Sequence, residues 1–204
     1  MDTFFIFFFV FGIFVWCIWQ LLSYTRNTIG GNSPLKVTRV YQISELAYFT
    51  KLDNLFSYSF LVLGLMFFKL IFTLRTAPDS ANPWMGYLVA ITFGFIFLTI
   101  GIFYLILDLN HWKYTEDVIL TTHPELHELE LTFSDITLRI KDGDIQRVVV
   151  IQNQAKIRFC YHTYFLQNGD HFILSDRMPG NWVIHEFFKK IPVEYHYKSF
   201  PYIS

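Results

Sequence analysis

The stretch MGYLVAITFGFIFLTIGIFYLIL, residues 85–107, contains no charged side chain. A helix of about 20 residues covers the roughly 30 Å of hydrocarbon in a bilayer. Two similar runs precede it, TFFIFFFVFGIFVWCIWQLL at residues 3–22 and a run at residues 55–74 whose one charge is Lys69. The sequence therefore predicts a membrane protein with three transmembrane helices, spanning about 3–22, 55–74 and 85–107.

Two details of these runs have alternative interpretations. A cleaved signal peptide would begin with basic residues, but the first charge here is Asp2, which favours an uncleaved first span. Lys69 is near the end of its run, so we interpret it as a side chain that reaches the headgroups. The alternative is a buried pore or relay residue.

Small residues recur along the third run. Gly86, Ala90 and Gly94 are four residues apart, and Gly101 follows seven residues later. Four-residue steps place small side chains on one helix face, where another helix can approach closely. We predict a helix-packing face, within the chain or between copies, although small residues are also simply frequent in membrane spans.

Positive charges predict the orientation. The segment between the first two runs, residues 23–54, contains four basic residues, whereas the next short loop contains only Arg75. The positive-inside rule then predicts a plasma-membrane protein with a cytoplasmic loop at 23–54, an N-terminus outside and a cytoplasmic C-terminal domain. The candidates for contacts with lipid headgroups are Arg26, Lys36, Arg39 and Lys113.

Composition changes near Asp108. Residues 1–108 hold 6 Lys and Arg against 5 Asp and Glu, and residues 109–204 hold 10 against 12. We therefore predict a transmembrane region at 1–108 and a separate domain at 109–204. Neither part is basic, so a nucleic-acid partner is not expected. The expected partners are the lipid bilayer and a protein partner or second copy. The two cysteines, Cys17 and Cys160, fall in different parts, which agrees with a cytoplasmic domain.

The distal part has the alternation of β-strands. Apolar residues alternate with polar ones at residues 129–133 and 136–140, and further strands are expected at 147–152, 157–166 and 171–175. Asp142-Gly143 and Asn168-Gly169 are hairpin signals. A helix then runs from Asn181 to Pro192, followed by a short extended tail. This order predicts an antiparallel bent sheet or partly open barrel with a C-terminal helix.

This order of strands and helix, with the phrase FLQNGDHFILSDRMPGNWVIHEFFKKIP at residues 165–192, resembles the pleckstrin-homology-like domains of small, uncharacterised bacterial membrane proteins. The resemblance covers about residues 117–203 and implies a binding or scaffolding module rather than an enzyme. Domains of this kind that bind lipid headgroups place basic residues around the first hairpin. The residues here that could take that place are Arg139, Lys141, Lys156 and Arg158.

We predict no catalytic residues, metal site or cofactor. The sequence contains no phosphate-binding loop, dinucleotide fingerprint or hydrolase motif. Cys160 and His162 share a strand face, but their Cβ atoms would be about 6.5–7 Å apart, which favours packing over catalysis. The group His123, Glu125 and His127 has zinc-ligand chemistry, but a solvated edge is the simpler interpretation.

The function predicted from the sequence is a membrane-anchored cytoplasmic interaction, scaffold or regulatory module. A small oligomeric membrane effector or channel-like protein is one alternative, suggested by the small-residue face and Lys69. An accessory subunit of a transporter or envelope complex is the other.

Overall fold

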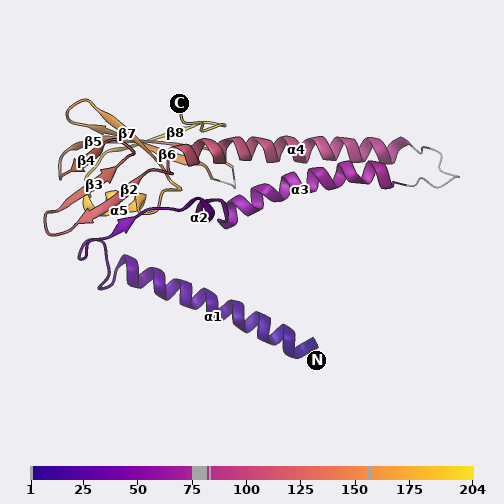
Figure 1. Cartoon of the computed structure of the whole chain (residues 1–204), viewed down its shortest axis with the longest axis horizontal. Helices are drawn as coiled ribbons and strands as arrows, with labels where there is room; N and C mark the ends of the chain where they lie inside the picture. The colour runs from indigo at the N-terminus through magenta and orange to yellow at the C-terminus, as the bar shows by residue number, and fades with distance from the viewer. Residues whose placement is uncertain (1, 75–81, 83, 156–157) are drawn as a thin grey trace.

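The computed structural model describes residues 2–74, 82, 84–155 and 158–204. Figure 1 shows a helical hairpin that extends from a β-rich part, with a separate long helix below it. The helices are α1 (Asp2–Thr28), α2 (Glu45–Phe49), α3 (Leu52–Thr73), α4 (Trp84–Lys113) and α5 (Asn181–Phe187). The strands are β1 (Val40–Tyr41), β2 (Ile119–His123), β3 (Glu128–Thr132), β4 (Thr137–Ile140), β5 (Ile145–Gln152), β6 (Cys160–Leu166), β7 (His171–Ser175) and β8 (Val193–Tyr197).

Helices α3 and α4 pack along their length because small residues let their backbones approach. A Cβ atom on Gly101 would lie 2.6 Å from Leu61, and one on Gly94 would lie 3.0 Å from Phe68. The contact is reciprocal, since a Cβ atom on Gly64 of α3 would lie 2.7 Å from Leu98. Stacked rings continue the interface at Phe60, Phe67, Phe93 and Phe97. The small-residue face of α4 therefore packs within the chain.

The prediction of three transmembrane helices is wrong. Among the described residues, only α4 is long and apolar enough to cross a membrane. Within the 22 residues of α3, the apolar part among the described residues covers Ser57–Thr73. In the first predicted span, the side chains of residues 3–10, 13, 17 and 20 lie outside the described set. The predicted orientation of the two termini assumed three spans, so the structure does not support it.

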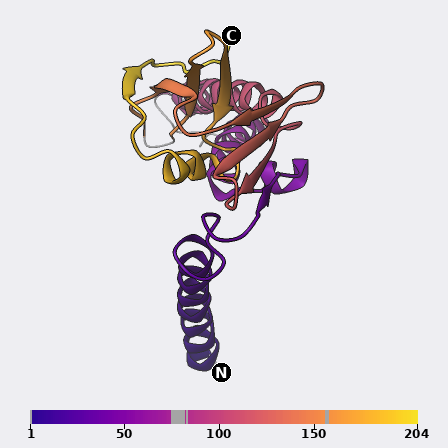
Figure 2. The same cartoon turned by 90° about the vertical axis from the view of Figure 1, so that its left-hand side faces the viewer.

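Helix α1 runs apart from the hairpin. Figures 1 and 2 both show it extending away from the β-rich part, whereas α3 and α4 lie side by side and are seen nearly end-on behind the sheets in Figure 2. After α1, the chain forms strand β1, which pairs with β2 through Val40 and Thr121. The segment predicted as a cytoplasmic loop at 23–54 thus contributes a strand to the β-rich part and then the short helix α2.

The prediction of one bent sheet or partly open barrel is also wrong. The strands form two four-stranded sheets, in the orders β1-β2-β3-β4 and β7-β6-β5-β8, without a closed barrel among the described residues. The first sheet is antiparallel, and β8 joins the second sheet parallel to β5. The extended tail predicted after the helix forms β8 of this second sheet.

The Asp142-Gly143 turn explains this error. Gly143 has a φ of 89°, and the Asp144 carboxylate accepts a hydrogen bond from the Lys141 amide, so the turn itself forms as expected. However, it connects β4 of the first sheet to β5 of the second. The flanking Ile140 and Ile145 are both buried in the core between the sheets. The turn therefore joins strands of two different sheets, and both of its flanking residues lie in the shared core.

The core lies between the two sheets and α5. It includes Leu120, Leu129 and Leu131 of the first sheet and Val148, Tyr164 and Leu174 of the second. Val183, Ile184 and Phe187 of α5 complete it, so the helix packs inward at three- and four-residue spacing. The inward and outward alternation of β3, with Leu129 and Leu131 fully buried, is the pattern that the sequence predicted.

The close approach of the helices generates a test. In the substitution Gly101→Ala, the new Cβ would lie 2.9 Å from the main-chain nitrogen of Leu61, which cannot rotate away. We expect the free energy of unfolding to fall by about 1–3 kcal/mol, measured by thermal unfolding of the full chain in detergent. The control is Gly12→Ala in α1, where nothing lies within 4 Å of the new Cβ. Equal stability of Gly101→Ala and the wild type would contradict the packing.

Candidate functional site

Helix α4 ends in a buried ion pair. Asp108 is fully buried, and Nη1 of Arg177, which follows β7, lies 2.7 Å from its Oδ1. The same guanidinium donates a hydrogen bond to Oδ1 of Asn54 in α3. A buried charge is costly unless it is paired. The pair therefore fixes the β7–α5 connection to both helices of the hairpin.

Aromatic rings surround this ion pair. The Arg177 guanidinium carbon lies 4.5 Å from the ring centre of Phe159 and 5.6 Å from that of Tyr48. The Tyr48 hydroxyl donates to the main-chain oxygen of Asp108 at 3.1 Å. Burial raises the pKa of Tyr48 above its ordinary value, so the phenol keeps the proton that it donates.

Two polar residues of α4 hold the C-terminal tail. His111 Nε2 lies 3.1 Å from the main-chain oxygen of Pro201, and its Nδ1 lies 2.9 Å from the Ser175 hydroxyl. Since a carbonyl only accepts, Nε2 carries the hydrogen and Nδ1 accepts from Ser175. Asn110 exchanges two hydrogen bonds with the main chain of Ile203, at 3.0 and 2.8 Å. The tail and the second sheet are thereby attached to the end of α4.

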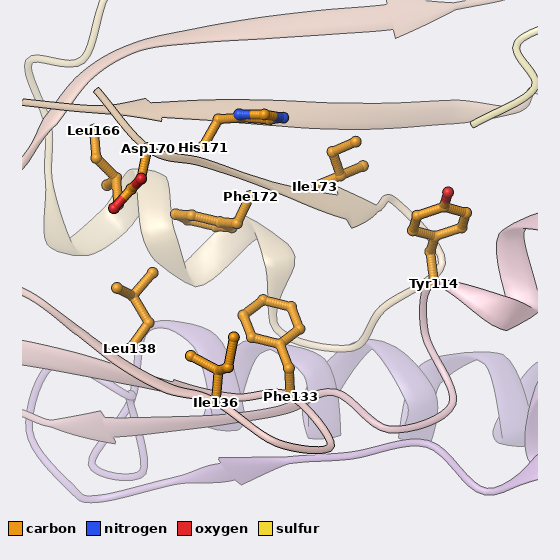
Figure 3. Close-up of a pocket in the computed structure, with 9 residues that line it drawn as sticks. All are labelled: Tyr114, Phe133, Ile136, Leu138, Leu166, Asp170, His171, Phe172 and Ile173. Carbon is orange, nitrogen blue, oxygen red and sulfur yellow. The ribbon is translucent and has the colours of Figure 1, made fainter. Parts of the chain in front are cut away.

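An apolar groove of about 600 Å³ opens beside this junction. Figure 3 shows Tyr114 at one end and Leu166 and Asp170 at the other, with Phe133 and Phe172 facing the space from opposite sides. Tyr114 directly follows α4, so this end of the groove is adjacent to the helix. The lining residues are Tyr114, Phe133, Ile136, Leu138, Leu166, Asp170, His171, Phe172 and Ile173.

The two sheets create the groove where their edges face each other. Strand β4 is the last strand of the first sheet and β7 is the last strand of the second, so each pairs on one side only within the described residues. Ile136, in the turn before β4, is 67% exposed at the groove, although it is a large apolar residue. An apolar groove between two open strand edges can take an extended peptide, which would pair with the backbone and bury alternate side chains.

The predicted helix-packing residues lie on α4. Ala90, Gly94 and Gly101 are buried, and a Cβ atom on Gly86 would lie 3.1 Å from Leu74. Of the predicted headgroup contacts, Arg26, Lys36 and Lys113 are exposed. Arg39 is different, because its guanidinium donates to the main-chain oxygen of Asn32 at 3.2 and 3.3 Å.

The structure does not bring the predicted ligand residues together. Arg139 and Lys141, on and just after β4, pair with Glu130 and Glu128 of β3 at 3.0 and 2.9 Å. Arg158 precedes β6 in the other sheet and donates to the Gln152 side chain. Lys156 lies outside the described residues.

Of the Cys–His pair and the zinc-like group that the sequence singled out, Cys160 lies in the core and His127 packs on an aromatic ring. Cys160 is buried, and burial raises the pKa of its thiol to about 12, so it stays protonated at neutral pH. The His127 ring stacks on Phe187 with 5.5 Å between ring centres. Among the described residues, no three His, Cys, Asp or Glu side chains are grouped so that they could hold a metal ion.

Sequence reasoning missed the partner of Asp108 and the groove. A lone carboxylate at the end of an apolar run requires a buried cation, but nothing in the sequence singles out Arg177, 69 positions away, from the other basic residues. The groove depends on the separation of the two sheets, which the hairpin signal at Asp142-Gly143 concealed.

Comparisons of the chain with family models, with curated proteins and with solved structures find no match. The resemblance to pleckstrin-homology-like domains of bacterial membrane proteins therefore stays a prediction. The functional argument rests on the geometry of the groove and of the junction.

The ion pair generates a second test. Arg177→Met leaves the Asp108 carboxylate buried without its cation, and we expect a loss of about 3–5 kcal/mol in unfolding free energy. The double substitution Asp108→Leu with Arg177→Met removes both charges and should recover most of that loss. Thermal unfolding of the full chain in detergent measures both effects.

The matched control is Arg147→Met. Arg147 pairs with Glu194 at 3.2 Å on the surface, where such a pair contributes less than about 1 kcal/mol. Similar losses for Arg177→Met and Arg147→Met would show that the buried pair does not hold the junction.

Proposed function

We propose that this chain is a membrane-anchored interaction module. In this proposal α4 lies in a bilayer with α3 packed along it, and the β-rich domain sits at the membrane surface. There the groove between β4 and β7 captures an extended apolar segment of a partner protein. The observation that carries the proposal is the position of this groove, which lies between two open strand edges on a domain attached to an apolar helix.

The outer surface of α4 supports membrane insertion. Helix α3 covers one side of α4, and large apolar residues elsewhere on α4 are exposed, including Ile96 at 46% and Ile102 at 48%. Each Å² of apolar surface kept in water costs about 25 cal/mol. A hydrocarbon environment removes that cost along the whole helix, and the length of α4, 30 residues, suits it.

Basic residues support a cytoplasmic position for the β-rich domain at the plasma membrane. Lys51 precedes α3 and Lys113 ends α4, so both are at the domain end of the hairpin. Arg26 and Lys36 lie in the segment that leads into β1. The preference of Lys and Arg for the cytoplasmic side of a membrane then favours placing this end inside.

The alternatives from the sequence have less support. The small-residue face of α4 suggested an oligomeric effector, but α3 of the same chain packs on that face. An accessory subunit of a transporter or envelope complex would use the same groove for a permanent partner. The following experiment identifies the captured protein, and a subunit of a transporter or envelope complex would favour this alternative.

The test places a photo-crosslinking phenylalanine analogue at Ile136 of the full chain in its own membranes. We expect an adduct with one protein, mapped by mass spectrometry to an extended apolar segment. Ile173→Asp puts a charge into the groove and should reduce the adduct at least tenfold, because burying that charge opposes the apolar contact. Tyr197→Asp, on an exposed position of β8 outside the groove, should leave it unchanged.

A second labelled position gives the background. The analogue at Trp182 of α5, which is 38% exposed and does not line the groove, should give no such adduct. An adduct from Ile136 that persists in Ile173→Asp, or no adduct at all, would contradict the proposal. Thermal unfolding of each variant confirms that it is folded.

A further inference from the structure

A second cavity, of about 300 Å³, lies on the second sheet beside the junction with α4. Unlike the groove, it is lined by polar side chains from several elements. Arg158 and His162 come from the β6 region, Asp176 follows β7, and His185 projects from α5. A small number of polar groups that converge on one cavity is a common property of small-molecule sites.

The orientation of His162 is fixed by a hydrogen-bond chain. The Tyr164 hydroxyl donates to Oδ1 of Asn181 at 2.8 Å, and Nδ2 of Asn181 lies 2.7 Å from Nδ1 of His162. The Asn181 amide nitrogen is a donor, so Nδ1 of a neutral His162 accepts and Nε2 carries the hydrogen. Burial lowers the pKa of His162 to about 4, which keeps the ring neutral. No described residue accepts from this Nε2–H, which is therefore available as a donor to a ligand.

Arg158 and Asp176 line the cavity without pairing with each other, and Arg158 donates a hydrogen bond to the Gln152 side chain. Among the ion pairs of the described residues, none joins Arg158 to Asp176. Both charges act on the Cys160 thiol in the cavity wall. Burial raises the pKa of that thiol most, Asp176 raises it further and Arg158 lowers it. The cavity therefore has an anionic and a cationic group close to the same wall.

A ligand that carries both charges matches this arrangement. An ammonium group would pair with Asp176, and a phosphate would accept hydrogen bonds from Arg158 and from Nε2 of His162. His185 also lines the cavity, and burial lowers its pKa, so its ring adds no charge there at neutral pH. A simple anion would be repelled by Asp176, and a simple cation by Arg158.

The cavity is close to the end of α4. Asp176 directly precedes Arg177, the partner of Asp108, and Phe159 stacks on Tyr104 of α4 at 5.8 Å between ring centres. We propose that this cavity binds a zwitterionic ethanolamine phosphodiester. That a membrane surface lies beside it rests on the proposed function, and the same chemistry is present in a lipid headgroup and in a soluble glycerophosphodiester.

The test titrates the full chain in detergent with three soluble probes by calorimetry. They are glycerophosphoethanolamine, glycerophosphoglycerol, which lacks the amine, and ethanolamine, which lacks the phosphate. We expect the first to bind at least tenfold more tightly than either of the others. Asp176→Asn should abolish the preference over glycerophosphoglycerol, and Arg158→Gln should abolish the preference over ethanolamine. The control Arg139→Gln, on the other sheet, should change neither preference.

A second arm compares thermal unfolding in nanodiscs of phosphatidylethanolamine and of phosphatidylglycerol. Greater stability in the former, lost in Arg158→Gln, identifies a lipid headgroup as the source, and a preference in solution alone identifies a soluble phosphodiester. No preference in either arm, or a preference that survives both substitutions, overturns the inference. Arg158 is exposed, so its variant should fold even if Asp176→Asn does not. Soluble binding does not require a membrane, so failure here is distinct from failure of the proposed function.

Discussion

Helix α4 is apolar on its outer side along most of its length and ends in buried polar residues, and the remainder of the structure depends on this division. Up to Leu107 its outer side is apolar and exposed, while Asp108, Asn110 and His111 are buried polar residues. The change occurs within one turn, where Arg177 neutralises Asp108 and the tail and second sheet attach. A rigid helix with this division holds a β-rich domain at a fixed distance from whatever surrounds its apolar part.

That attachment explains why the two candidate binding regions lie where they do. The groove begins at Tyr114, immediately after α4, and the polar cavity includes Asp176, immediately before the arginine of the ion pair. Each region therefore has a lining residue next to the point where the domain is attached to α4. The groove is apolar and open along two strand edges, which suits a protein segment, whereas the cavity is small and charged, which suits a polar headgroup.

Local patterns predicted local structure well. The alternation at residues 129–133 and the Asn168-Gly169 turn correspond to β3 and to the antiparallel β6–β7 hairpin. The pairing of strands that are far apart in the sequence could not be predicted in the same way. Strand β1, residues 40–41, pairs with β2, although the helices α2, α3 and α4 separate the two strands in the sequence. Strand β8 pairs parallel to β5, and no turn signal indicates such a pairing. The three-span prediction was wrong, because only α4 among the described residues is long and apolar enough to cross a membrane. In the buried ion pair, Asp108 could be recognised from the sequence as a polar residue at the end of an apolar run, but Arg177 could not.

The most direct test of the account concerns the outer side of α4. Single cysteines at Ile91, Phe95, Ile102 and Ile106, in a chain with Cys17 and Cys160 replaced by serine, would be spin-labelled in nanodiscs. All four positions are exposed on α4. The account predicts collisions with dissolved oxygen far more often than with a water-soluble nickel complex at every position, because the helix is surrounded by hydrocarbon. Free access of the nickel complex along the helix, or a full-length chain that stays monomeric in water without detergent, would contradict it.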